Sequence, residues 1–202
     1  MPTRAVINDI NPTLVACYRV IQQGVDELIE RLTEHAARHS LAHYHAIRAR
    51  DRDPDFATAP AVERAARLIY LNRTCFNGLY RVNADGFFNV PIGRYTNPVI
   101  CDTPVLRAVH AYLRDNDITI LQGTYAAATR TAQAGDIVYY DPPYHSPTKA
   151  NFTAYDAGGF DAAAQATLAE DYTELTQRGV WCLLSNADTP LIRSLYAGYA
   201  IR

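Results

Sequence analysis

The chain has 202 residues, of which 49% are hydrophobic and 20% charged, and its formal net charge is -2. This length suits one domain with a substantial core and a small inserted subdomain, and the composition is that of an ordinary globular protein. No apolar run is long enough to span a bilayer and no signal peptide is present, so we expect a cytoplasmic protein with no membrane partner. The cysteines form no C-x-x-C pair, which favours reduced thiols over a disulfide framework or a zinc site.

Short β-forming runs alternate with helical patterns along the chain. Asn11 followed by Pro12 is typical of a helix start, and apolar residues then recur every three to four positions from Leu14 to Leu32, which predicts one amphipathic helix. Strands are expected over residues 4–9, 118–122, 136–141 and 179–186, and further helices over 61–71 and 161–178. Strands that alternate with helices indicate an α/β fold with a parallel sheet.

The middle of the chain interrupts this alternation. Between Arg38 and Arg94 there are nine Arg and no Lys against five acids, about +4, so the remainder of the chain carries about -6. The segment 39–99 ends in a stretch rich in Asn, Gly, Arg and aromatic residues, with turn signals at "NG" and "ADG". We interpret it as a loop-rich insertion that meets a polyanion, and an Arg-rich solvated surface is the alternative.

Two acids end predicted strands, where open α/β sheets bind ligands. Asp9 suits the hydroxyl groups of a ribose, although a helix-capping or turn role is equally open. Asp141 begins "DPPY", in which two prolines stiffen the chain and remove two amide donors. The Asp141 carboxylate and the Pro142 carbonyl then form a pair of acceptors beside Tyr144, an arrangement that suits the amino group of a flat base.

"DPPY", "YLNRTCFNGLYRVNADGFFNVPIGRY" and "ANFTAY" together resemble the Dam-type (D12 class) adenine-specific DNA methyltransferases, over nearly the whole chain. The resemblance implies a Rossmann-like methyltransferase sheet built from residues 1–38 and 100–202, with 39–99 as a mostly helical and loop-rich target-recognition insertion. It implies methyl transfer from S-adenosylmethionine to N6 of an adenine flipped out of double-stranded DNA.

The resemblance also implies residue roles. Asp141, Pro142, Pro143 and Tyr144 match the catalytic tetrapeptide, and Asp9, Thr124, Tyr125 and Asp141 match cofactor-binding positions. Arg81 matches a guanine reader, and because Leu79 and Pro91 match positions that contact a thymine methyl, a GATC-like site is implied. The remaining matches to DNA-contacting positions are Phe76, Asn77, Asn83, Asn89 and Arg94. Asn151, Phe152 and Tyr155 match a loop that closes over the target adenine.

The sequence departs from the family at both ends. It contains no Phe-x-Gly-x-Gly turn of the kind that cradles the methionine part of the cofactor, and it stops at "AGYAIR" where the family continues. We therefore expect an enzyme truncated at both ends. The alternatives are a non-catalytic or split-enzyme fragment that works with a complementing N-terminal fragment, and an enzyme that methylates the amino groups of RNA or a protein glutamine.

Three histidines, His35, His39 and His43, lie four residues apart and suggest a shared helix face. Metal sites use such spacing, but Ser40 and the lack of nearby acids favour a solvated helix end. We therefore expect no metal.

Overall fold

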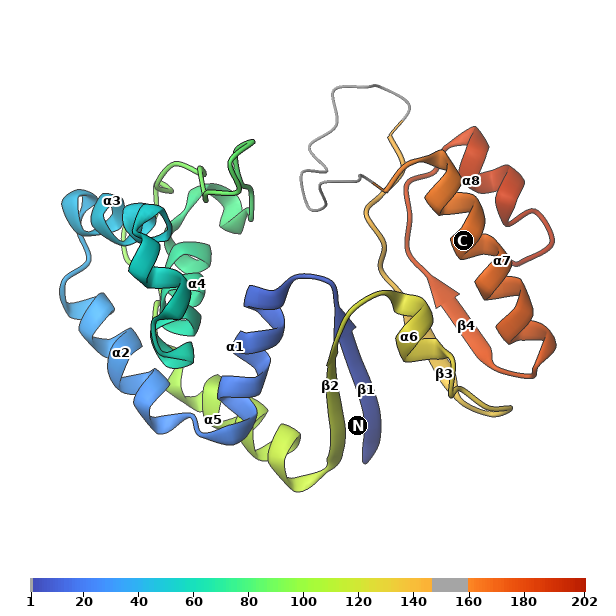
Figure 1. Ribbon diagram of the computed structural model, residues 1–202, viewed down its shortest axis with the longest axis horizontal. Coiled ribbons are helices and arrows are strands. Elements are labelled where there is room, and N and C mark those ends of the chain that lie inside the picture. The colour runs from blue at the N-terminus through green and yellow to red at the C-terminus, as the bar shows by residue number, and fades with distance from the viewer. Residues whose placement is uncertain (1, 147–159) are drawn as a thin grey trace. The chain divides into compact units, whose positions relative to one another are not determined.

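The structure is a computed structural model that describes residues 2–146 and 160–202. The chain forms two compact units, Met1–Ala128 and Thr129–Arg202, and each contains one pair of parallel strands (Figure 1).

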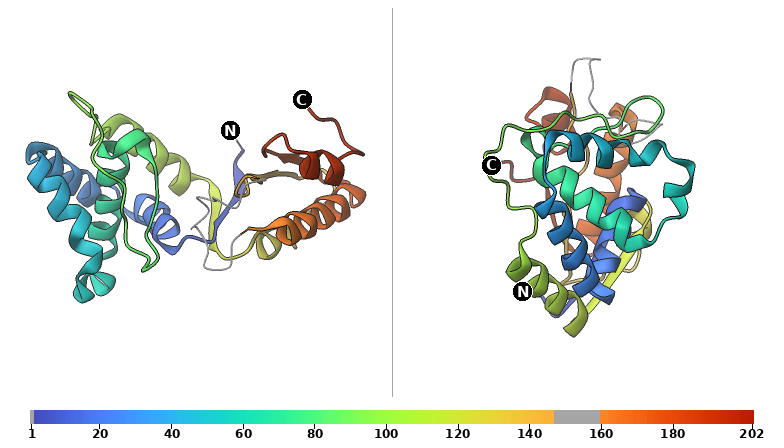
Figure 2. Two further views of the ribbon diagram at one scale, coloured as in Figure 1. Left: turned by 90° about the horizontal axis from the view of Figure 1, so that it is seen from above. Right: turned by 90° about the vertical axis from the view of Figure 1, so that its left-hand side faces the viewer.

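In the first unit, β1 (Arg4–Asp9) pairs in parallel with β2 (Asp117–Gln122), and the register places Asp9 opposite Gln122. Five helices lie between these strands along the chain and gather beside them (Figure 2). They are α1 (Pro12–Gln23), α2 (Asp26–Ala37), α3 (Leu41–Ala49), α4 (Ala61–Thr74) and α5 (Thr103–Asp115). Short 3₁₀ turns occur at Arg50–Arg52, Pro54–Thr58 and Phe76–Gly78.

The predicted start of α1 is confirmed, but the single helix from Leu14 to Leu32 is wrong. The Asn11 side chain accepts hydrogen bonds from the amides of Thr13 and Leu14, at 2.9 and 3.3 Å. The helix ends before Gly24, whose extended backbone separates α1 from α2. Apolar periodicity continues through the break because both helices direct their apolar side chains into the same core, so the pattern alone did not reveal it.

The core of this unit joins the helices on both sides of residue 39. Leu28 and Leu32 of α2 are fully buried with Tyr44 of α3 and Tyr70 of α4, and Val90 of the following loop region belongs to the same cluster. Segment 39–99 therefore shares its hydrophobic core with α1 and α2, and its treatment as an insertion stays a prediction.

In the second unit, β3 (Ile137–Tyr140) pairs in parallel with β4 (Trp181–Leu184), as predicted apart from narrower bounds. The helices are α7 (Ala162–Gln177) and α8 (Pro190–Leu195), and α6 (Tyr125–Thr129) lies at the border between the units. Helix α7 begins as predicted, since Asp161 caps it by accepting a hydrogen bond from the Ala164 amide at 2.9 Å. It packs on β4, where the Tyr172 hydroxyl donates to the Cys182 carbonyl at 2.7 Å.

These elements confirm a mixed α/β chain with parallel strand pairs. All four cysteines are free thiols, and burial raises the pKa of Cys17 to about 11. None of the described helices is long and apolar enough to cross a bilayer.

Candidate active site and nucleic-acid interface

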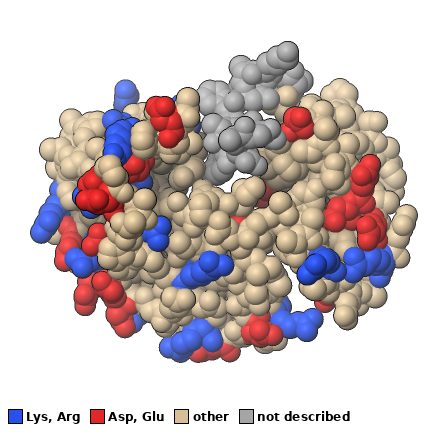
Figure 3. Space-filling view, in the orientation of Figure 1, with Lys and Arg blue, Asp and Glu red and all other residues tan. Residues whose placement is uncertain are grey.

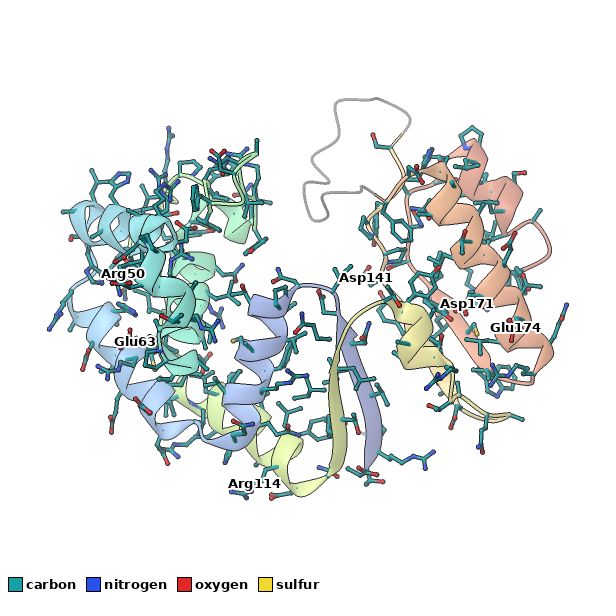
Figure 4. The ribbon with its side chains drawn as sticks, in the orientation of Figure 1. Arg50, Glu63, Arg114, Asp141, Asp171 and Glu174 are labelled. Carbon is teal, nitrogen blue, oxygen red and sulfur yellow. The ribbon has the colours of Figure 1, made fainter. Side chains whose placement is uncertain are left out.

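Asp141 directly follows β3, and its side chain is exposed (Figure 4). Its Oδ1 accepts a hydrogen bond of 2.6 Å from the hydroxyl of Ser185, a residue that directly follows β4. The Ser185 oxygen in turn accepts a hydrogen bond of 3.0 Å from the Tyr139 hydroxyl. The carboxylate is thus oriented through one oxygen while the side chain stays open to solvent, which leaves its second oxygen available as an acceptor.

The corner after Asp141 is fixed from α7 and from the loop after β4. Gln165 of α7 is fully buried, donates from Nε2 to the Pro143 carbonyl at 2.9 Å, and accepts from Asn186 Nδ2 at 3.0 Å. Asn186 Oδ1 accepts from the His145 amide at 2.9 Å. The carbonyl of Pro143 is therefore occupied. Tyr144 stands 51% exposed between the two fixed positions, so its ring is free to pack on a flat partner.

Tyr140, the last residue of β3, is anchored in the core of the second unit. Its hydroxyl donates to Asp171 Oδ2 of α7 at 2.6 Å, and Asp171 is labelled on that helix in Figure 4. Burial, followed by the hydrogen bond to the Asp171 carboxylate, raises the pKa of Tyr140. The tyrosine therefore stays protonated and serves as a structural anchor beneath Asp141.

The predicted cofactor residues of the first unit lie together at the carboxyl ends of β1 and β2. The Gly123 amide donates to the Asp9 carbonyl at 3.1 Å, and the Asn8 side chain donates to the Gly123 carbonyl at 3.0 Å. Thr124 and Tyr125 follow directly. Asp9 Oδ1 accepts the Asn11 amide at 2.7 Å, so one oxygen has the turn role, whereas the cap of α1 is Asn11 itself. The other carboxylate oxygen is available for a hydroxyl donor, which fits a ribose.

The predicted DNA-contacting residues occupy loops after α4. Phe76 and Leu79 are about half exposed, and the side chains of Pro91 and Arg94 are exposed. Asn77 has a positive φ of 52°, a conformation that Asn tolerates better than most residues. These side chains therefore face solvent, whereas Arg81, Asn83 and Asn89 are partly buried.

Arg81 and Asn89 face each other across a short hairpin. The Asn89 amide donates to the Arg81 carbonyl at 3.0 Å, and Arg81 Nε donates to Asn89 Oδ1 at 2.7 Å. The Asn83 side chain accepts from the Phe87 amide at 2.8 Å and so closes the turn. Asn83 and Asn89 thus hold the loop itself, and Asn89 orients the guanidinium of Arg81.

Four of the nine arginines of this region show two different settings. Arg52 and Arg67 form ion pairs of 2.7 Å with Asp51, and the side chain of Arg67 is only 11% exposed. In Figure 3, basic and acidic side chains are interspersed over the helices of the first unit. Arg73 and Arg94, by contrast, line one open depression of about 850 Å³ together with Asn77. Arg73 and Arg94 are therefore better placed to meet a polyanion than Arg52 and Arg67.

Comparison with known proteins supplies the family. The family model of the D12 class N6 adenine-specific DNA methyltransferases matches residues 1–202. The chain belongs to this family. It is 44% identical over 202 residues to a type II methyltransferase of Lactococcus lactis subsp. cremoris, covering 99% of this chain and 71% of the relative. A type II methyltransferase of Methanocaldococcus jannaschii is 37% identical over 98% of this chain and 71% of its own length. The DNA adenine methylase of Escherichia coli K12 is 34% identical over 96% of this chain and 68% of its own length.

Membership of the D12 class makes the chain an enzyme of the adenine-specific DNA methyltransferase type, and a methyl donor is implied by the family. Within each unit, the structure gathers the predicted residues at strand ends and on exposed loops. Asn151, Phe152 and Tyr155 lie outside the described residues.

Sequence reasoning did not single out Arg73, Gln165, Ser185 or Asn186. A signal existed for Gln165, because it shares helical spacing with the buried Leu168 and Tyr172. Ser185 and Asn186 directly follow β4, just as Asp141 directly follows β3, so the parallel pairing of these strands indicates their proximity.

The three histidines do not share one helix face. His35 lies on α2, His43 on α3, and His39 in the link between these helices. His35 Nδ1 is 3.1 Å from His43 Nε2, and His39 bonds the Tyr70 hydroxyl at 2.9 Å. Burial, followed by the charge of His43, lowers the pKa of His35 to about 4. Within the part of the chain that the structure describes, no cluster of three metal-binding side chains occurs.

Proposed function

We propose that the chain transfers a methyl group from S-adenosylmethionine to N6 of an adenine flipped out of duplex DNA, at a GATC-like site. The observation that carries this proposal is the exposed Asp141, oriented by Ser185 and followed by a proline corner whose second carbonyl is occupied by Gln165. The Asp141 carboxylate and the Pro142 carbonyl accept hydrogen bonds from the adenine amine. Tyr144 stacks on the face of the base.

S-adenosylmethionine supplies a methyl group bound to a positively charged sulfur. Asp9 would hold this cofactor by accepting hydrogen bonds from its ribose hydroxyls, and Thr124 and Tyr125 would contact its adenine. By accepting a hydrogen bond from the target amine, Asp141 concentrates lone-pair density on the N6 nitrogen instead of leaving it delocalised into the ring. Positioning and electrostatics then supply most of the rate acceleration, since the protein forms no covalent bond itself.

Arg81 reads a guanine through O6 and N7, and Leu79 and Pro91 contact a thymine methyl. Phe76 fills the space left by the flipped adenine, while Asn77, Asn83, Asn89 and Arg94 contact phosphates or support the loops. The parallel strand pairs are typical of a Rossmann-like methyltransferase sheet, which we propose as the architecture, with 39–99 as the target-recognition insertion.

Transfer of a radiolabelled methyl group from S-adenosylmethionine to synthetic duplexes tests the proposal. We expect label in N6-methyladenine for a duplex with GATC, and at least tenfold less label when the guanine is replaced. An RNA of the same sequence and a glutamine-containing peptide should accept none. Equal labelling of RNA and DNA would contradict the proposed substrate, and equal labelling of both duplexes would contradict the proposed site.

A second candidate is an enzyme that acts only with a complementing segment, which carries a glycine-rich cofactor turn. It is favoured by the exposed face of β3–β4, where Ile137, Tyr139, Trp181 and Leu183 are each at least 60% exposed, since parallel sheets are usually covered on both faces. Titration calorimetry with S-adenosylmethionine separates the two. Binding by the 202-residue chain supports independent action, whereas an absence of heat supports the second candidate.

A further inference from the structure

The short hairpin that carries Arg81 has little stability of its own. We define it as residues 81–89, the recognition hairpin. Its arms are joined by an isolated bridge between Val82 and Phe88, and an isolated two-stranded hairpin is at best marginally stable in water. Its conformation therefore depends on anchors elsewhere in the unit.

The returning arm of the recognition hairpin is fixed to the segment after α3 through Phe88. Asp51 Oδ2 accepts the Phe88 amide at 2.7 Å, and Arg52 donates to the Phe88 carbonyl at 3.3 Å. These two bonds use the backbone groups of Phe88 and leave its side chain buried. Asn89, which orients Arg81, is the next residue, so a shift at Phe88 is passed directly to the guanidinium.

Asp51 is itself held in place by charge. Its side chain is 17% exposed and lies 2.7 Å from Arg67 NH2 and from an Arg52 nitrogen. Arg67 is fixed to α3 through the carbonyls of Ile47 and Arg48, at 2.9 and 2.8 Å. One carboxylate therefore receives three donors, two of them cationic, and hydrogen bonds to charged groups are the stronger kind.

We propose that Asp51 is a positioning residue for base recognition: it fixes the recognition hairpin at Phe88 and so sets the direction of the Arg81 guanidinium. This inference rests on the proposed function, in which Arg81 reads a guanine. Asp51 makes no contact with DNA in this account. Its loss therefore relaxes the choice of sequence, and it changes general affinity for duplex DNA only as much as the loss of any one nearby negative charge does.

The experiment compares the full chain with its Asp51→Asn variant and with Asp53→Asn as a matched control. Asp53 is two residues away and pairs with Arg50 at 3.1 Å, but the structure gives it no bond to the recognition hairpin. Both substitutions remove one negative charge, so both raise general attraction to DNA equally. An amide at position 51 still accepts one hydrogen bond, but its NH₂ group faces cationic donors.

Fluorescence anisotropy at fixed salt gives the Kd for a GATC duplex and for one with the guanine replaced. The quantity compared is the Kd for the guanine-substituted duplex divided by the Kd for the GATC duplex. This ratio is independent of the fraction of folded protein. For Asp51→Asn we expect the ratio to fall at least about fivefold, the smaller end of what a bidentate Arg–guanine contact contributes. For the guanine-substituted duplex, the Kd of Asp51→Asn should match the Kd of Asp53→Asn within about twofold.

An unchanged ratio in Asp51→Asn would overturn the inference while leaving the proposed function intact. A wild-type chain with equal constants for both duplexes would contradict the proposed function and this inference with it. If Asp51→Asn does not fold, Arg67→Met serves instead, because it leaves the carboxylate in place but removes its main anchor. The same fall in the ratio is expected there, and an unchanged ratio again overturns the inference.

Discussion

Replacement of the buried Gln165 by Met tests how the catalytic corner is held. The two side chains are similar in length, so packing on α7 is largely retained, but both hydrogen bonds of Gln165 are lost. The Pro143 carbonyl and the Asn186 amide are left without these partners. A fully buried unsatisfied polar group costs about 1–3 kcal/mol. Because these two groups are only partly buried, their loss should together lower the free energy of unfolding of this unit by about 2 kcal/mol, the lower end for two groups.

The assay is urea denaturation followed by the fluorescence of Trp181, the sole tryptophan, which lies on β4 in the same unit. The matched control is Gln177→Met, at an exposed position of the same helix, with an expected change within about 0.5 kcal/mol. Because a released Pro143 carbonyl lets the proline corner move, kcat should fall on the order of 100-fold in the Gln165 variant. Equal stabilities and equal turnover in the two variants would refute the reasoning.

The variant Gln165→Glu adds a pH signature. A protonated carboxyl donates to the Pro143 carbonyl as the amide did, whereas a carboxylate repels it, so burial should raise the pKa of the new group above its unfolded value of about 4.3. A raised pKa in the folded state means that stability is greatest at low pH and is lost as pH rises. The stability gap between variant and wild type should therefore be smallest below about pH 4.3 and widen above it. A gap that is constant with pH would contradict this role.

Three further predictions concern the first unit. Arg81→Lys keeps the charge but loses the planar fork, so discrimination between GATC and guanine-substituted duplexes should fall by about 1–3 kcal/mol in anisotropy titrations, with little change in general affinity; equal discrimination would argue against Arg81 as the reader. Because the folded pKa of His35 is lowered to about 4, the unfolded chain binds more protons between about pH 6.5 and 4, and stability falls as pH falls through that window. His35→Phe should make this loss shallower in urea titrations, and an identical slope would exclude His35 as its source. Gly93→Ala brings a Cβ to 2.8 Å from the Cys75 carbonyl oxygen, so duplex affinity and thermal stability should both drop. Retention of both would contradict this expectation and show that the loop has room to move.

Sequence reasoning succeeded where the determining interactions are local. The Asn11 cap and the Pro12 start involve neighbouring residues, and "DPPY" carries its stiffness in its own prolines. The break at Gly24 was missed because α1 and α2 keep one apolar period while packing into one core. Periodicity reports which side chains are buried, and it does not report whether the helix is continuous.

The supporting polar contacts could not be predicted because they join distant parts of the chain. Asp51 meets the Phe88 amide 37 residues away, and Ser185 meets Asp141 44 residues away. A lone Asp or Ser in a polar stretch has the same pattern whether it is solvated or buried against a partner. Gln165 is the intermediate case, because its helical spacing contained a signal for burial, which was not used, but no signal for the carbonyl that it contacts.

The most direct test of the account is the single-turnover rate of labelled methyl transfer to adenine N6 in a GATC duplex, measured for the wild type and for Asp141→Ala. The account holds that Asp141 accepts a hydrogen bond from the reacting amine, and removal of one such preorganised group costs on the order of 100- to 1,000-fold in rate. We therefore expect at least a 100-fold slower transfer by Asp141→Ala, with a Kd for the duplex within about twofold of the wild type. Transfer by Asp141→Ala within tenfold of the wild-type rate would contradict the assignment of this corner as the catalytic site.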